Sequence, residues 1–121
     1  MEIVNVTRAF TISPNAQYRD TFLGRFRGLM LSPRRDIILA GKRESIMDST
    51  IHMMWMLYPI DVIWVSAGMK VVDVKRGVPP FNPLKPKTWE LHEPKAAAKY
   101  VVEVSVGDLK DTQTGDDVAF R

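Results

Sequence analysis

Two polar side chains interrupt a long apolar stretch of the sequence and could carry out proton transfer. His52 and Asp61 lie within the run from Ile51 to Val65, whose other residues are aliphatic, aromatic, methionine or proline. A histidine beside a carboxylate can act as a general acid or base, and the two groups can also bind a metal ion. The alternative is structural: Asp61 accepts backbone hydrogen bonds at the start of a strand, and His52 is satisfied in or beside the core.

Glu103 is a third residue that could take part in this chemistry. It interrupts the strand-like and mostly apolar run from Lys99 to Val106. It could join Asp61 as a paired carboxylate, so that His52, Asp61 and Glu103 form the catalytic set of a hydrolytic or metal-assisted enzyme. The clean period-two alternation of this run instead favours a Glu103 side chain that faces water.

A long proline-rich segment is a candidate binding loop. The stretch from Gly77 to Pro94 contains five prolines, which interrupt any helix or strand, and it also carries Phe81, Trp89 and His92. Loops of this length are uncommon in small domains and are often functional. The three side chains could recognise a ligand or partner, or the segment could fold back over one end of the sheet.

A basic segment suggests an anionic partner. Residues 25–43 hold six Lys or Arg side chains against the single carboxylate of Asp36. Arg25 and Arg27, beside Gly28 at the end of a predicted helix, could bind an anion. The segment as a whole could bind nucleic acid with help from the loop aromatics. A solvated basic face without a ligand is the competing interpretation.

The composition excludes several classes of function. The chain of 121 residues has no cysteine, which removes disulfides, thiolate nucleophiles and cysteine-ligated metal sites. No phosphate-binding loop, dinucleotide fingerprint or nucleophile elbow is present, and we predict neither a cofactor nor a metal site. No membrane-length apolar segment or signal segment is present. We therefore expect one cytoplasmic domain, 1–121, as a monomer or weak homo-oligomer with no membrane association.

The elements that would position these residues are mostly strands. Ile51–Leu57 and Ile60–Ser66 are strand-like runs that bend at Tyr58-Pro59, which predicts a hairpin that places His52 and Asp61 on adjacent strands. A short helix is predicted after Ser13-Pro14, through Tyr18 to Met30. The remaining predicted strands are 3–6, 9–12, 36–40, 69–75, 99–106 and 118–120, with turns at Gly41-Lys42, Gly107-Asp108 and Gly115-Asp116. The fold class is mainly β (α+β): a small barrel-like sheet of about seven strands with one or two short helices.

The order of short motifs resembles a known family, the domain of unknown function 192. The resemblance covers residues 20–120 and rests on Arg25-Phe26-Arg27-Gly28-Leu29-Met30, Ile51-His52-Met53-Met54-Trp55-Met56, Pro59-Ile60-Asp61, Tyr100-Val101-Val102-Glu103, Gly107 and Gly115-Asp116. It implies a small β-dominated fold with little helix. It implies no activity, because the family is uncharacterised.

Three functions remain open on this basis. The first is a module that binds a small ligand or a protein partner through the 77–94 loop and the His52/Asp61 hairpin. It is favoured because catalytic signatures are absent. The second is the hydrolytic or metal-assisted enzyme. The third is nucleic-acid binding through residues 25–43.

Overall fold

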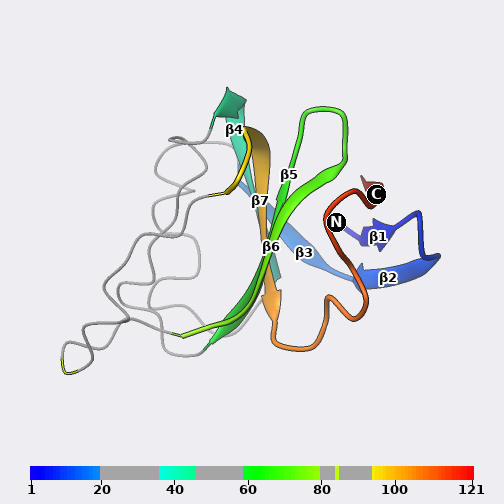
Figure 1. The fold of residues 1–121 in the computed structure, drawn as a ribbon. Helices are drawn as coiled ribbons and strands as arrows, with labels where there is room; N and C mark the ends of the chain where they lie inside the picture. Colours follow the sequence, from blue (N-terminus) through cyan, green and yellow to red (C-terminus); the bar gives the residue numbers. More distant parts are fainter. Residues whose placement is uncertain (20–35, 46–58, 80–83, 85–93) are drawn as a thin grey trace.

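The computed structural model describes residues 1–19, 36–45, 59–79, 84 and 94–121. Within these ranges the chain forms strands joined by turns (Figure 1). They are β1 (Ile3–Asn5), β2 (Phe10–Ser13), β3 (Ala16–Arg19), β4 (Asp36–Ser45), β5 (Ile60–Val65), β6 (Val71–Val78), β7 (Ala98–Ser105) and β8 (Val118–Phe120). No helix of the length and apolar character needed to cross a membrane occurs in the described ranges.

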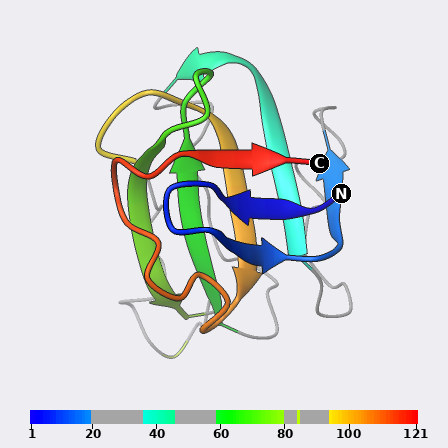
Figure 2. The same cartoon turned by 90° about the vertical axis from the view of Figure 1, so that its right-hand side faces the viewer.

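The strands make two sheets that pack face to face. One sheet has the order β2-β1-β8, and the other has the order β3-β4-β7-β5-β6. The pair β3–β4 is parallel, and all other pairs are antiparallel. The three strands of the smaller sheet run across those of the larger one (Figure 2). Crossed packing of this kind buries the facing side of both sheets.

The larger sheet is apolar on both faces. In β5, Ile63 and Val65 belong to the core cluster shared with the smaller sheet, whereas Val62 and Trp64 belong to a second cluster. Successive strand residues point to opposite faces, so the two clusters lie on opposite sides of the sheet. All six residues of β5 are buried, which explains why its sequence shows no polar face.

The mainly-β class is confirmed, with two differences in architecture. The described strands form two sheets rather than one closed barrel, and the larger sheet ends at β3 on one side and at β6 on the other. The predicted helix after Ser13-Pro14 is wrong at its start, because Tyr18 lies in β3. Pairing of β3 with β4 overrides the helical spacing of the sequence here. Residues 20–30 of that prediction lie outside the described residues.

The predicted hairpin between Ile51–Leu57 and Ile60–Ser66 is not formed by β5. This strand pairs with β6 along one edge and with β7 along the other. Since a strand has only two edges, β5 has none left for the 51–57 run, which itself lies outside the described residues. The adjacent-strand argument for His52 and Asp61 therefore fails. The predicted turn at Gly41-Lys42 is also wrong, because β4 continues through it to Ser45.

Two glycine turns confirm the sequence prediction and fix the chain after β7. Gly107 and Gly115 have φ values of 95° and 98°, a region that residues with a Cβ rarely adopt. Between them, the segment returns to the larger sheet. The Gly115 N–H donates to the Val71 carbonyl and the Val71 N–H donates to the Asp116 carbonyl, at 2.8 and 2.9 Å. These bonds bring the 107–116 segment against the start of β6.

Candidate functional site

Asp61 accepts two backbone hydrogen bonds at the start of β5. Its Oδ1 accepts from the Gly77 N–H at 2.8 Å and its Oδ2 accepts from the Gly107 N–H at 2.9 Å. The side chain is buried. Asp61 therefore ties the end of β6 and the turn after β7 to the strand that lies between them, in agreement with the structural alternative for this residue.

Glu103 is buried, so the prediction that it faces water is wrong. It pairs with Val62 on β5 and with Ile37 on β4, in the middle of the larger sheet. Period-two alternation does place the Glu103 side chain on the other face of the sheet from Val102 and Val104. That face, which Glu103 shares with Val62, is buried as well. Desolvation by this burial raises the pKa of Glu103 from 4.5 to about 7.

Asp61 and Glu103 do not form a carboxylate pair. In the register of β5 and β7, Asp61 lies opposite Val104 and Glu103 lies opposite Val62. Neighbouring positions along a strand alternate between faces, so the two carboxyl groups are on opposite sides of the sheet. A mechanism that needs both groups at one reacting centre has no support from this register.

The other predicted site residues lie outside the described residues. They are His52, Arg25, Arg27, Phe81, Trp89 and His92. Their proposed roles in catalysis or binding stay predictions. Among the residues that the structure does describe, no group of three or more histidine, aspartate or glutamate side chains is placed to hold a metal ion.

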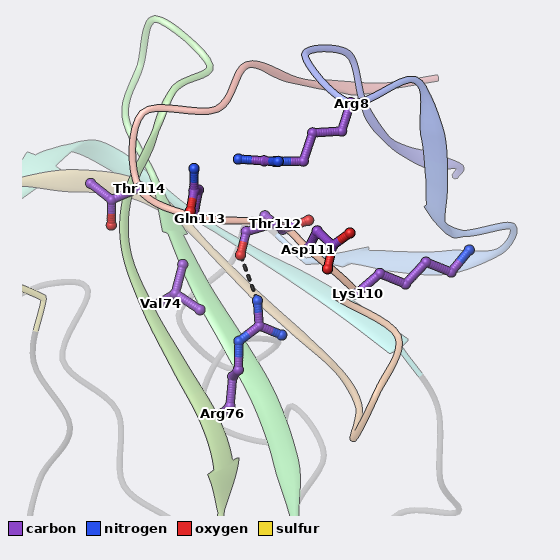
Figure 3. A pocket seen from close by; sticks show the side chains of 8 residues that line it. All are labelled: Arg8, Val74, Arg76, Lys110, Asp111, Thr112, Gln113 and Thr114. Atoms are coloured by element: carbon purple, nitrogen blue, oxygen red, sulfur yellow. Dashed lines mark hydrogen bonds between the residues drawn. The ribbon is translucent and has the colours of Figure 1, made fainter.

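An open cavity of about 780 Å³ lies between β6 and the segment that follows β7 (Figure 3). The described part of its lining is mostly polar and carries three cationic side chains and one carboxylate. The residues that line it are Arg8, Val74, Arg76, Lys110, Asp111, Thr112, Gln113 and Thr114. The structure thus brings together arginines from the β1–β2 turn and from β6, which are far apart in the sequence.

Arg8 is held on one side of its guanidinium group only. Its Nε–H donates to Oδ2 of Asp116 at 2.7 Å. Within the part of the chain that the structure describes, its two terminal nitrogens make no hydrogen bond. The side chain is 31% exposed, and it extends toward Gln113 at the cavity (Figure 3). Arg8 therefore presents its terminal N–H groups to the cavity.

The other two cations differ in their direction. Arg76 reaches from β6 toward Thr112, and one of its terminal nitrogens donates to the Thr112 carbonyl at 2.6 Å. Lys110 extends away from both arginines (Figure 3), and its ammonium lies 5.1 Å from the centre of the Phe10 ring. The two guanidinium groups, rather than all three cations, thus define the charged part of the cavity.

The buried carboxylate of Asp116 stabilises the position of the Arg8 guanidinium group. Burial raises the pKa of Asp116. Hydrogen bonds from Asn5, Arg8 and Gln113 and the charge of Arg8 lower it by more than burial raises it, so its pKa lies below the ordinary 3.8. Asp116 is therefore ionised at neutral pH, as an ion pair with Arg8 requires.

Sequence reasoning missed Arg8, Arg76 and Asp116 as a group. Arg8 and Asp116 are 108 residues apart, and no linear motif joins them. The turn signal at Gly115-Asp116 was the one available indication that this segment returns to the sheet, and it says nothing about which side chains meet there.

Replacement of Asp61 by asparagine should destabilise the protein by about 2–4 kcal/mol, because the amide NH₂ would face one of the two backbone donors and leave it unpaired. Urea unfolding at pH 7 measures this. The control is Asp117→Asn, which removes an exposed pair with Lys70 and should cost about 1 kcal/mol or less. If Asp61→Asn costs no more than the control, Asp61 does not hold the two turns.

Replacement of Glu103 by glutamine should change the pH dependence of stability. In the wild type the folded pKa of about 7 lies above the unfolded value of 4.5, so stability falls as pH rises through this window. The gap corresponds to about 3 kcal/mol. Glu103→Gln should match the wild type near pH 4.5 and exceed it by this order above pH 7 in urea unfolding. Parallel curves for the two proteins would show that Glu103 has an ordinary pKa.

Comparison with known proteins shows a family whose sequences are similar to this chain over nearly its whole length. The DUF192 family profile, described as an uncharacterized ACR, matches residues 4–120. The UPF0127 protein of Thermococcus sibiricus is 34% identical over 98% of this chain and 74% of its own length. The UPF0127 protein of Pyrococcus furiosus is also 34% identical, over 98% of this chain and 97% of its own length.

Two crystal structures share the fold at low sequence identity. A protein of unknown function from Novosphingobium aromaticivorans superposes with a TM-score of 0.80 at 15% identity, over 98% of this chain and 82% of that one. A candidate transcription regulator from Sinorhizobium meliloti gives a TM-score of 0.80 at 13% identity, over 98% and 89%. At these identities the likeness concerns the fold alone. The family profile and the 34% identical relatives show that this chain belongs to the uncharacterised DUF192 family, whose relatives carry the name UPF0127.

Proposed function

We propose that this protein is a binding module for a small anionic ligand, a phosphate- or carboxylate-bearing molecule, which binds in the cavity between Arg8 and Arg76. The observation that carries the proposal is the state of the Arg8 guanidinium. Its Nε–H is bound to Asp116, and its terminal nitrogens make no hydrogen bond to any described residue. Arg8 lines an open cavity, and its side chain extends toward Gln113 there (Figure 3). A guanidinium whose remaining donors point in fixed directions matches the geometry of an oxyanion.

Partial immobilisation of Arg8 favours binding over a purely structural role. An arginine loses side-chain freedom when it binds a ligand, and this loss lowers affinity. At Arg8 much of that freedom is already lost in the folded protein through the Asp116 contact. Arg76 is similarly anchored by the carbonyl of Thr112. A ligand would therefore meet two donors that are already oriented.

The remaining lining supports a small polar ligand. The hydroxyl of Thr114 and the amide of Gln113 can each donate or accept hydrogen bonds. The cavity volume of about 780 Å³ falls in the range of small-molecule sites, roughly 300–1,000 Å³. Among the lining residues that the structure describes, Asp111 is the one carboxylate, and the cations outnumber it. A free anion is thus a better match than a cation.

The described residues favour binding over hydrolysis. Both Asp61 oxygens are engaged by backbone N–H groups, and Glu103 lies on the opposite side of the sheet. Among the described residues that line the cavity, there is no histidine, cysteine or serine to form a nucleophile–base pair. The enzyme hypothesis built on His52 and the nucleic-acid hypothesis built on residues 25–43 stay predictions.

Isothermal titration with inorganic phosphate at constant ionic strength tests the proposal. The wild type should bind one phosphate. Arg8→Gln and Arg76→Gln should each weaken binding by at least about tenfold, since a charge-assisted hydrogen bond contributes roughly 1.5–3 kcal/mol. Thermal unfolding of each variant verifies that it folds.

The matched control is Lys110→Gln. It removes one positive charge from the same cavity lining, but the Lys110 ammonium lies over Phe10 and away from the two arginines. Its phosphate affinity should fall by less than about twofold, as expected for a screened long-range effect. Absence of phosphate binding by the wild type would overturn the proposal, as would an equal loss in Lys110→Gln and Arg8→Gln.

A further inference from the structure

One carboxylate oxygen connects the wall of the cavity to β1 and to the turn that follows it. Oδ2 of Asp116 accepts hydrogen bonds from Nδ2 of Asn5 at 3.0 Å, from Nε of Arg8 at 2.7 Å and from the backbone N–H of Gln113 at 3.0 Å. Asn5 is on β1, Arg8 is in the turn after it, and Gln113 is in the cavity wall. The arginine and the wall that it faces are therefore positioned by the same atom.

The turn that carries Arg8 is itself fixed to this centre. The Arg8 backbone N–H donates to Oδ1 of Asn5 at 3.0 Å, and Nδ2 of the same amide also donates to Oγ1 of Thr112 at 2.9 Å. Asn5, Thr112 and Asp116 are buried. Both the backbone and the Nε–H of Arg8 are thus tied to buried polar groups. Within the described residues, only the terminal nitrogens of its side chain make no hydrogen bond.

We infer that Asp116 is a positioning residue for anion binding: by holding Nε of Arg8, it directs the terminal N–H groups of the guanidinium into the cavity. This inference rests on the proposed function of the cavity. The guanidinium group is planar, so a bond at Nε sets the plane and the direction of the other four N–H groups. Asp116 itself does not touch the ligand.

The sign of the effect separates positioning from simple electrostatics. A carboxylate close to an anion site repels the anion, so loss of the Asp116 charge should tighten binding if charge alone mattered. If Asp116 orients Arg8, the same substitution should weaken binding, because the arginine must then be ordered by the ligand. The two accounts predict opposite changes in affinity.

A double-mutant cycle on the full chain tests this inference, with inorganic phosphate as the probe. Asp116→Ala, which removes the acceptor, should weaken phosphate binding about fivefold to tenfold. Arg8→Lys, which keeps the charge but not the fork, should weaken it to a similar extent. The double variant should bind no more weakly than the weaker single variant, because both changes remove one interaction. Unchanged or tighter binding by Asp116→Ala, or losses that multiply in the double variant, would overturn the inference.

The control for a general loss of stability is Asp36→Ala. Asp36 is a half-buried carboxylate that also accepts two hydrogen bonds, from Ser13 and from the Ser105 N–H, but it has no hydrogen bond to Arg8 or to the described cavity lining. Its loss should lower stability and leave the phosphate affinity unchanged. Failure of the wild type to bind phosphate would remove the proposed function itself. Normal wild-type binding together with normal Asp116→Ala binding would remove only the positioning role.

A spectroscopic measurement on the wild type needs no variant. The Arg8 Nε–Hε signal in a ¹H–¹⁵N spectrum at neutral pH should be resolved and should exchange slowly with water, before and after saturation with phosphate. The signal of Arg121, which is exposed, is the internal reference. An Arg8 signal that exchanges as fast as that of Arg121 would show that the guanidinium is not held, and would overturn the inference even if Asp116→Ala does not fold.

Discussion

Buried aspartates that accept backbone N–H groups are the interaction on which the rest of this structure depends. Asp61 binds the N–H groups of Gly77 and Gly107, and Asp73 binds the N–H groups of its neighbour along β6 and of Lys95. A turn packed against a sheet has backbone donors that no strand can satisfy, and an unpaired buried donor is costly. In these cases a carboxylate on the sheet supplies the acceptor. The ends of the strands are thereby fixed relative to one another.

The same device accounts for the candidate binding site. Asp116 binds the backbone of the cavity wall at Gln113, but it also binds a side chain, Arg8, which faces outward. The contact with Asp116 thus orients the Arg8 guanidinium group, while its terminal nitrogens make no hydrogen bond to a described residue. Glu103 is different from these aspartates: it is buried in the sheet, and desolvation raises its pKa to about 7, whereas hydrogen bonds keep the pKa of Asp116 low. The pKa values of Glu103 and Asp116 thus shift in opposite directions, because desolvation dominates at Glu103 and hydrogen bonds with the charge of Arg8 dominate at Asp116.

The sequence allowed the fold class to be predicted, but not the pairing of strands. Alternating or fully apolar runs and the glycine turns at Gly107 and Gly115 are local signals, and they indicated β5, β7 and the closing strand correctly. Which strand lies beside β5 is a nonlocal property, since a run that is apolar on both faces carries no information about its neighbours. The predicted hairpin failed for this reason.

The site was harder to predict than the fold for the same physical reason. Alternation shows that Glu103 faces away from Val102, but whether that second face is covered depends on the rest of the fold. The structural alternative for Asp61 was that it accepts backbone hydrogen bonds at the start of a strand. The structure shows two such bonds, from the N–H groups of Gly77 and Gly107. The contact of Arg8 with Asp116 joins the two ends of the chain, and no local pattern in either segment indicates it.

The central claim is that the cavity between Arg8 and Arg76 binds an anion, and mapping the binding position by NMR tests it most directly. Uniformly ¹⁵N-labelled protein would be titrated with inorganic phosphate at constant ionic strength. The account predicts that the amide of Gln113 and the side-chain Nε–Hε signals of the two arginines shift along one common saturation curve, while the amides of β3 and β4 do not move. Saturable shifts that arise only in residues 20–35 or 80–93, or no saturable shift at all, would contradict it.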